Sequence, residues 1–192
     1  MTPLRLVVFG PQGAGKGTQC ARLSERYGVP HIATGDMLRA AVAEGTEMGR
    51  EAKRYMDAGD LLPDDVITGV VAERLDQSDA AEHGFCLDGF PRTVGQAESL
   101  RQMLAPDFID AAIEIDVPTD VLVDRMAKRG RADDTVDAIR RRLELYDQET
   151  RPVLAWFAQH GSVAHVDGVG TEDDVEERMV KVIEAHSGTD AA

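Results

Sequence analysis

The chain has 192 residues, of which 43% are hydrophobic and 29% are charged. This balance is typical of one compact globular domain and excludes a collagen-like, largely disordered or disulfide-stapled chain. Lys and Arg number 21 against 35 Asp and Glu, a formal net charge of −14, so the mean field of the chain repels nucleic acids and anionic membranes. A phosphate ligand therefore requires a local positive site.

Strand-like apolar runs alternate with helical patterns along the chain. Strands are expected at 6–9, 85–87, 112–117 and 163–166, with a weaker fifth at 31–33. Helices are expected at about 15–27, 36–43, 47–58, 64–76, 93–104, 119–128, 134–158 and 171–186. Because parallel strands are joined by helical crossovers and buried on both faces, this alternation predicts an α/β fold with a parallel sheet between two helical layers.

Two irregular stretches interrupt this alternation. Residues 36–76 contain several short helices, broken at Gly59 and Pro63, and are too long for a simple crossover. We expect them to form an inserted helical lobe. Residues 128–134 link two helices, and their composition indicates a short surface cap.

The cysteines and histidines give no sign of a metal site or a disulfide framework. Cys20 and Cys86 lie in apolar or helical surroundings and are expected to be small buried thiols, and the five histidines are scattered without metal-ligand spacing. No apolar run reaches the ~18 residues of a membrane span, and the first residues lack the pattern of a signal peptide. We therefore expect a cytoplasmic protein with reduced thiols and no membrane or nucleic-acid partner.

A phosphate-binding pattern follows the first predicted strand. Gly10, Gly15 and Lys16 satisfy the G-x-x-x-x-G-K core of a P-loop. Glycines let successive backbone N–H groups turn toward a phosphate, the next helix presents its positive N-terminus, and the lysine adds a full charge. The residue after Lys16 is Gly17 rather than Ser or Thr, and the hydroxyl comes one place later at Thr18, so its usual role cannot be copied directly.

A carboxylate and an arginine follow the predicted strand at 85–87. Asp88 ends an apolar run, where a charge is costly unless it is solvated, paired or close to a metal ion, and P-loop proteins need such a group to hold the waters of Mg²⁺. Arg92 follows Pro91, which stiffens the loop, and we expect it to clamp a phosphate. A helix cap at Asp88 and a surface position for Arg92 are the alternatives.

The segment 125–142 concentrates basic charge, with seven basic residues against three aspartates. Arg129 and Arg131 flank a glycine, as expected of mobile arginines in a lid that closes over a phosphoryl group. At about 100° per residue, Arg141 points away from the apolar stripe of its predicted helix and is expected in solvent. Arg142 borders that stripe and is expected at the site.

Three motifs together resemble the nucleoside monophosphate kinases. They are the end of the P-loop at 15–18, the segment 34–39 and the segment 88–92, which occur in the order found in that family. The closest resemblance is to the adenylate kinase family in its short-lid form, over about residues 4–186. It implies a single P-loop kinase domain over 1–192 with a five-stranded parallel sheet, an NMP-binding lobe at about 33–62 and a lid at about 128–136.

The resemblance also implies roles for individual residues of this chain. The ATP-binding residues would be Gly13, Ala14, Gly15, Lys16, Gly17, Thr18, Arg129 and Gly170. The AMP-binding residues would be Thr34, Arg39, Asp60, Leu61, Leu62, Gly89, Phe90, Pro91, Arg92, Gln96, Arg131 and Arg142. The catalytic set would be Lys16, Asp88, Arg92, Arg129, Arg131 and Arg142. Gln12 stands where a proline is common, and we expect little effect from that change.

The implied reaction is reversible phosphoryl transfer from Mg-ATP to AMP, giving two ADP. Mg²⁺ would arrive with ATP and be held mainly through water, oriented by Asp88. The expected lid is too short for a structural zinc site and has no cysteine, so no zinc and no metal ligated directly by protein is implied. The expected partners are ATP, AMP and ADP, bound by a monomer.

Two other functions stay open. One is a UMP/CMP kinase; such kinases tend to have Ala at the position of Thr34 and another residue at that of Gln96, so both positions favour AMP. The other is a P-loop nucleotide sensor that binds ATP without transferring phosphate. A sensor would not need the arginines of the AMP side together with Gln96.

Overall fold

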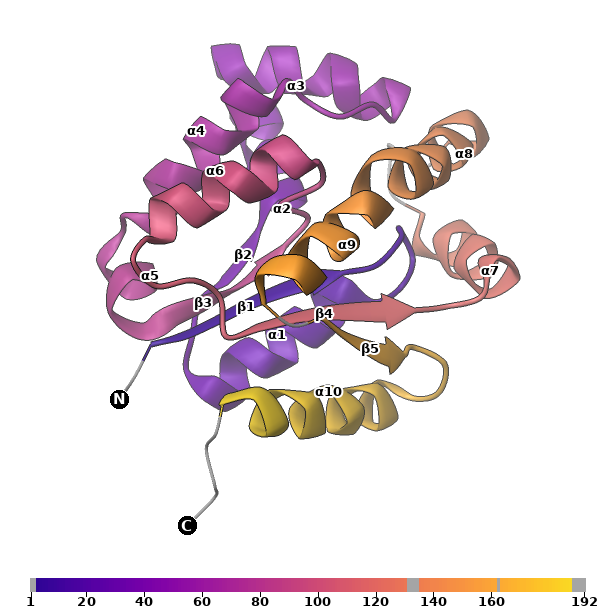
Figure 1. Ribbon diagram of the computed structural model, residues 1–192. Coiled ribbons are helices and arrows are strands. Elements are labelled where there is room, and N and C mark those ends of the chain that lie inside the picture. The colour runs from indigo at the N-terminus through magenta and orange to yellow at the C-terminus, as the bar shows by residue number, and fades with distance from the viewer. Residues whose placement is uncertain (1–2, 131–134, 162, 188–192) are drawn as a thin grey trace.

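The computed structural model describes residues 3–130, 135–161 and 163–187 (Figure 1). Within these residues, five parallel strands form one sheet in the order β2-β3-β1-β4-β5. The strands are β1 (Leu4–Phe9), β2 (His31–Ala33), β3 (Gly84–Asp88), β4 (Ala111–Asp116) and β5 (Val163–Asp167). The five strand predictions, including the weak one at 31–33, are confirmed.

Strand β1 lies at the centre because its apolar run serves both faces of the sheet. It pairs with β3 on one side, with Val8 opposite Asp88, and with β4 on the other, with Val8 opposite Ile113. Leu6 and Val8 belong to the hydrophobic cluster under one face, whereas Val7 and Phe9 belong to the cluster on the other. A strand buried on both faces therefore reads as a continuous apolar run.

Helices cover both faces of the sheet (Figure 1). α6 (Val94–Leu104) and α9 (Arg151–His160) pack on one face, and α1 (Lys16–Tyr27) and α10 (Glu172–Ser187) pack on the other. α7 (Thr119–Arg129) adds Leu122 and Met126 to the second cluster. The predicted α/β fold with two helical layers is confirmed.

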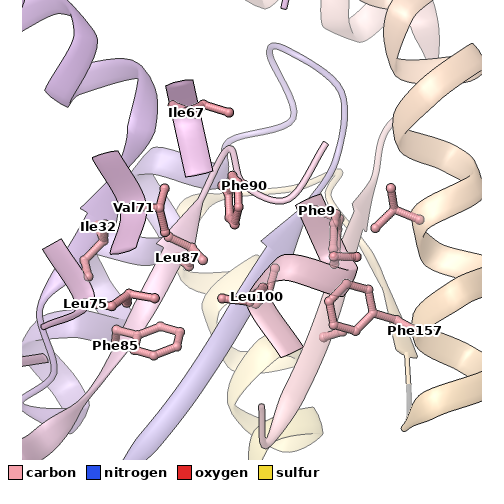
Figure 2. Close-up of a cluster of buried hydrophobic side chains, with 14 of the residues drawn as sticks. Phe9, Ile32, Ile67, Val71, Leu75, Phe85, Leu87, Phe90, Leu100 and Phe157 are labelled. Carbon is pink, nitrogen blue, oxygen red and sulfur yellow. The ribbon is translucent and has the colours of Figure 1, made fainter. Parts of the chain in front are cut away.

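The cluster on the α6 and α9 face is mainly aromatic and aliphatic (Figure 2). The ring of Phe9 meets that of Phe157 edge-on, with ring centroids 5.3 Å apart. Leu87 and Leu100 are fully buried beside them. Each such side chain stabilises the fold by about 1.5–3 kcal/mol, so this core holds β1 and β3 rigidly at the point where the site begins.

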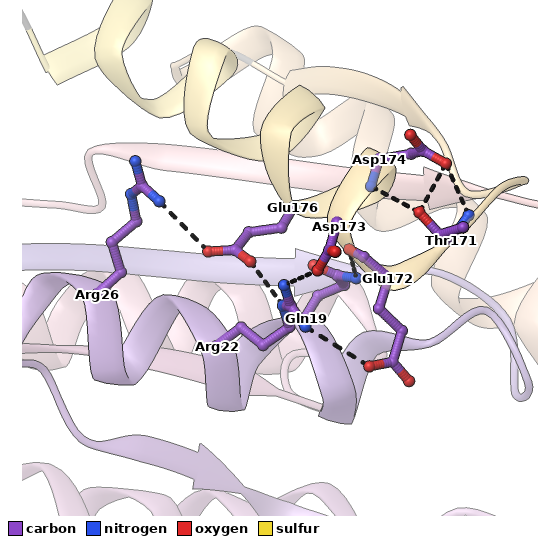
Figure 3. Close-up of polar contacts among 8 residues, drawn as sticks. All are labelled: Gln19, Arg22, Arg26, Thr171, Glu172, Asp173, Asp174 and Glu176. Carbon is purple, nitrogen blue, oxygen red and sulfur yellow. Dashed lines mark hydrogen bonds and ion pairs between the residues drawn. The ribbon is translucent and has the colours of Figure 1, made fainter.

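Polar contacts tie α1 to the start of α10 (Figure 3). Arg22 forms ion pairs with Glu172, Asp173 and Glu176, the last at 2.6 Å. The Gln19 side-chain amide donates to the carbonyl oxygen of Glu172 at 3.0 Å. These contacts fix the turn before α10 against the first turns of α1.

Four helices lie between β2 and β3, where the sequence predicts an inserted lobe. They are α2 (Thr34–Glu44), α3 (Glu47–Ala58), α4 (Asp64–Leu75) and α5 (Ser78–His83). Gly59 ends α3 with φ 76°, and Pro63 caps the N-terminus of α4, as the two predicted breaks require. α5 was not predicted, because six residues with one buried side chain, Ala80, give no periodic signal.

The described part of the helix predicted over 134–158 is helical throughout, but it is not one regular α-helix. The described part of that stretch contains α8 (Val136–Leu145), a π-helical turn at Tyr146–Thr150 and then α9. Pro152 has no N–H, so the regular hydrogen-bond ladder cannot pass through the first turn of α9. In the wider turn before it, the Arg151 backbone N–H donates to the Tyr146 carbonyl oxygen, and both Tyr146 and Thr150 are buried.

Both cysteines are buried and unbridged, as predicted. Among the described residues, none of the helices combines the length and the apolar character that a membrane span requires.

Candidate active site

A cavity of about 710 Å³ opens at the carboxyl ends of the central strands. In parallel α/β sheets this edge is where ligands bind, because the loops that follow the strands gather there. Every site residue that the sequence predicts lines this cavity, apart from Arg131. Arg131 lies outside the residues that the structure describes, as do 132–134 of the expected lid.

The P-loop joins β1 to α1 and shapes one end of the cavity. Gly13 has φ 89°, and a Cβ atom there would lie 3.0 Å from the carbonyl oxygen of Leu122 and 3.2 Å from the Met126 side chain. Only glycine fits this conformation and this approach. Gly15 caps α1 without a side chain, so the first N–H groups of the helix face an incoming anion.

Lys16 is folded back over the same loop. Its ammonium group donates to the carbonyl oxygens of Gly10 at 2.8 Å and Pro11 at 3.1 Å. Burial lowers the pKa of Lys16, although the nearby Asp88 opposes this shift. The loop therefore holds the lysine at the phosphate end of the cavity.

Asp88 stands at the end of β3, beside the N-terminus of α1. A Cβ atom on Gly17 would lie 3.6 Å from the carboxylate oxygen Oδ2 of Asp88. Burial alone would raise the pKa of Asp88, but the opposing effects of His31 and Lys16 outweigh it and the pKa falls below its usual value. An ionised carboxylate thus faces the phosphate end of the cavity. His31 was not singled out in the sequence, because only the pairing of β2 with β3 brings it to Asp88.

The loop after β3 forms the other end of the cavity. A Cβ atom on Gly89, which has φ 83°, would lie 2.7 Å from the Thr34 hydroxyl oxygen and 2.9 Å from a guanidinium nitrogen of Arg92. Arg92 donates through Nε to the carbonyl oxygen of Gly89 at 2.7 Å, and its own carbonyl oxygen accepts from the Thr150 hydroxyl at 3.0 Å. Burial and the neighbouring Arg142 and Arg39 lower the pKa of Arg92, although Asp88 opposes this, and an arginine remains charged in any case.

Gln96 and Thr34 are buried at this end. The Gln96 side-chain oxygen accepts from the backbone N–H of Arg92 at 2.7 Å, and its nitrogen donates to Asp64 at 2.6 Å. Thr34 donates to the carbonyl oxygen of Asp88 at 3.3 Å. A primary amide has two N–H groups and two acceptor positions. The two hydrogen bonds above use one N–H group and one acceptor position of Gln96, which leaves one N–H group and one acceptor position for a ligand.

Arg142 connects the two ends of the cavity. Its guanidinium group donates to the side-chain oxygen of Gln12 at 3.2 Å and to the carbonyl oxygen of Met56 at 2.9 Å. Arg141 is exposed, as expected, but it also donates to Asp60 at 2.7 Å. The prediction that the two neighbouring arginines lie on different faces is confirmed.

The structure adds Arg125 to the predicted site residues. Its guanidinium group lies within 3.5 Å of the carbonyl oxygens of Gly13 and Ala14 and donates to that of Gly168 at 3.0 Å. Arg125 and Arg129 are four residues apart on α7 and therefore share a face. That spacing could have identified Arg125 from the sequence.

Positive charge from both ends converges on this one cavity. The cationic residues that line it are Lys16, Arg39, Arg92, Arg125, Arg129 and Arg142. The chain as a whole carries a formal net charge of −14, so the cavity gathers positive side chains on an otherwise acidic protein. An arrangement of this kind binds and stabilises phosphate groups.

Comparison with known proteins gives a consistent result over most of the chain. The adenylate kinase family model matches residues 8–162. An adenylate kinase of Stenotrophomonas maltophilia (strain R551-3) is 49% identical over 186 residues, which cover 94% of this chain and 99% of that protein. An adenylate kinase of Nocardia farcinica is 50% identical over 182 residues, with 94% and 99% covered. One of Mycobacteroides abscessus is 51% identical over 174 residues, with 90% and 94% covered.

Proposed function

This chain belongs to the adenylate kinase family, and we propose that its cavity holds ATP at the P-loop end and AMP at the Arg92 end. It is an ATP:AMP phosphotransferase that catalyses the reversible reaction ATP + AMP ⇌ 2 ADP. The observation that carries the proposal is the convergence of cationic side chains from both ends of one cavity. Their charge offsets the repulsion between two anionic nucleotides.

The ATP phosphates are proposed to lie in the P-loop and on the N-terminus of α1. Lys16 would leave its carbonyl partners for the phosphate oxygens, which offer a stronger, charged acceptor. The proposed ATP-binding residues are Gly13, Ala14, Gly15, Lys16, Gly17, Thr18, Arg129 and Gly170.

AMP is proposed to bind between α2, the loop after β3, and α8. Arg92, Arg39 and Arg142 would hold its phosphate, and Gln96 would use its remaining donor and acceptor on the adenine edge. The other proposed AMP-binding residues are Thr34, Asp60, Leu61, Leu62, Gly89, Phe90 and Pro91. Arg131 is proposed for the same site from the resemblance alone, since it lies outside the described residues.

Mg²⁺ is proposed to enter with ATP. The ion prefers oxygen ligands and keeps several waters, and the ionised Asp88 carboxylate and the Thr18 hydroxyl offer oxygen atoms at the phosphate end. The residues present therefore fit the ion. It would neutralise charge on the transferred phosphoryl group, and Asp88 would orient its waters.

Phosphoryl transfer requires no general base in this proposal. The attacking oxygen belongs to the AMP phosphate and is already anionic, so the protein has to align the two nucleotides and stabilise charge. Water must be excluded, or ATP is hydrolysed instead. We expect the lobe at 33–62 and the lid at about 128–136 to close over the nucleotides and so exclude it. All these groups come from one chain, and a monomer is proposed to suffice.

The test is a coupled assay of ADP formation from ATP and Mg²⁺ with AMP, UMP or CMP. We expect rapid turnover with AMP, little with the two pyrimidine nucleotides and almost none when the monophosphate is omitted. Preference for UMP or CMP would assign the chain to the pyrimidine-nucleotide kinases. ATP binding without turnover on any of the three would indicate a nucleotide sensor.

A further inference from the structure

Three metal-ligating side chains from different elements meet beneath the active site. They are Cys20 on α1, His31 on β2 and Asp88 at the end of β3. One ligand atom from each, a sulfur, an imidazole nitrogen and a carboxylate oxygen, lies within 4.8 Å of the other two. We propose that these three residues bind a thiophilic divalent cation, Zn²⁺ or an ion of similar chemistry, and that its binding inhibits the enzyme.

The strand register explains why the three groups converge. β2 pairs with β3 so that His31 lies opposite Cys86 and Ala33 lies opposite Asp88. α1 packs over this part of the sheet, and Cys20 and Cys86 belong to the same buried cluster. The sulfur of α1 therefore faces the imidazole and the carboxylate from above the strands.

The position of the imidazole suits an ion shared with the carboxylate. Within the described residues, His31 Nε2 is buried and has no hydrogen-bond partner. It lies 3.7 Å from Asp88 Oδ2, which is too long for a hydrogen bond. Two donors that each bind one shared Zn²⁺ at about 2.0–2.1 Å lie roughly 3.3–4 Å apart, so this spacing suits a shared ion.

A cation would bind His31 and Cys20 in their deprotonated forms. A bound cation would replace the imidazole proton and the thiol proton of Cys20, and both protons would pass to solvent.

The donor set separates this site from that of the nucleotide-bound Mg²⁺. Thiolate and imidazole ligands select Zn²⁺ and similar ions, whereas Mg²⁺ takes oxygen ligands. Asp88 lines the nucleotide cavity, so an ion and a water for its open fourth position can enter from that side.

Inhibition follows from the shared carboxylate, and this part rests on the proposed function. Asp88 is proposed to orient the waters of Mg²⁺, and a carboxylate bound to Zn²⁺ is withdrawn from that role. The site would thus couple the availability of a soft metal ion to phosphoryl transfer without any change at the P-loop itself.

The direct test uses Co²⁺ and Zn²⁺ with the nucleotide-free, reduced protein. Co²⁺ is expected to bind one per chain with a thiolate-to-cobalt charge-transfer band, and Zn²⁺ is expected to displace it. His31→Gln and Cys20→Ala should each weaken binding by at least about tenfold. His165→Gln, the same change at an exposed histidine on β5, should leave binding unchanged. Thermal unfolding of each variant, with and without Zn²⁺, checks that it is folded and whether the ion stabilises it.

Absence of the charge-transfer band in the wild-type protein, or equal binding by folded His31→Gln, would overturn the site. A separate activity assay tests the consequence: one equivalent of Zn²⁺ should inhibit the wild-type enzyme and spare whatever activity His31→Gln retains. Equal inhibition of both would overturn the coupling. Because the Co²⁺ titration needs no turnover, its result stands apart from that of the proposed function.

Discussion

The two ends of the cavity would bind phosphate by different means. At the P-loop end backbone N–H groups would supply most of the phosphate contacts, because Gly13 and Gly15 adopt positive φ angles and leave these groups facing the site. At the proposed AMP end side chains dominate: Gln96 is buried, Arg92 is half-buried, and both are held by hydrogen bonds to their surroundings. The P-loop end therefore depends on backbone conformation, whereas the other end depends on its side chains.

This difference predicts which substitutions should weaken nucleotide binding in general and which should change the preference among monophosphates. A change at a P-loop glycine alters the cradle itself and should weaken any nucleotide triphosphate. A change at Thr34 or Gln96 alters groups that we propose contact the monophosphate, and should change which one is accepted. Lys16 is the exception at the P-loop end, because it contributes a side-chain charge.

Replacing Lys16 by Ala is expected to have the largest effect. The change removes the one lysine charge at the P-loop, and loss of such a preorganised contact typically lowers the rate by 10²–10³. Steady-state kinetics measure kcat, and circular dichroism checks the fold. Lys53→Ala, at an exposed lysine on α3, is the matched control and should keep wild-type turnover. Wild-type turnover in Lys16→Ala would remove this residue from the mechanism.

Replacing Arg92 by Ala should lower kcat/KM for AMP by about 10², at the lower end of the same range because Arg39 and Arg142 lie close by. The effect should fall on AMP more than on ATP, since Arg92 belongs to the side-chain end. Arg101→Ala on the exposed face of α6 is the control. Equal losses for both nucleotides would contradict the division of the cavity into two ends.

Replacing Gly13 by Ala should destabilise the protein by about 1–2 kcal/mol, because its φ of 89° is unfavourable for a residue with a Cβ atom, and should raise the KM for ATP. Urea unfolding measures the free energy. Gly69→Ala is the control: Gly69 lies inside α4 with open space around it, so this change should stabilise by up to about 1 kcal/mol. A Gly13→Ala variant as stable as wild type would show that the loop does not need glycine.

Replacing Thr34 by Ala should shift specificity with little loss of stability. The hydroxyl contacts the carbonyl oxygen of Asp88 and faces the monophosphate end, and a hydrogen bond of about 1 kcal/mol corresponds to roughly a fivefold to tenfold change. The ratio of kcat/KM for AMP to that for UMP should fall by this factor. An unchanged ratio would leave the preference for AMP to Gln96 and the backbone.

The smallest effect is expected for Arg141→Ala. Its ion pair with Asp60 joins α8 to the segment that follows α3, but both side chains are more than two-fifths exposed, at 45% and 42%. Exposed ion pairs contribute little to stability, and salt screens them. The KM for AMP should change by less than about fivefold at low salt and not at all at high salt, and a larger effect would give this pair a role in holding the lobe.

Local patterns predicted most of the fold and part of the cavity, and the family resemblance implied the other cavity residues. The P-loop and the loop at 88–92 each contain several site residues within a few positions. Residues so close in the sequence are also close in the structure, so their spacing alone predicts that they lie together. The strands were predicted because burial on both faces leaves a continuous apolar run. The difference between Arg141 and Arg142 followed from helical periodicity alone.

The features that were missed depend on contacts between distant parts of the chain. His31 comes to Asp88 only through the β2–β3 register, and Arg125 reaches the P-loop only because α7 packs beside it. The π-helical turn reflects the combination of Pro152 with the burial of Tyr146 and Thr150 against other elements. Among these features, only Arg125 has a signal in the sequence, because it lies four residues before Arg129 on the same helix.

The proposed function requires one cavity to hold both nucleotides with their phosphates facing each other. A compound that joins ATP to AMP through their phosphate groups is the sharpest probe of this arrangement, by calorimetric titration in competition with each nucleotide. We expect one molecule to bind per chain, far more tightly than either nucleotide, and to displace both ATP and AMP. Competition with ATP alone, or binding of two molecules per chain, would contradict it.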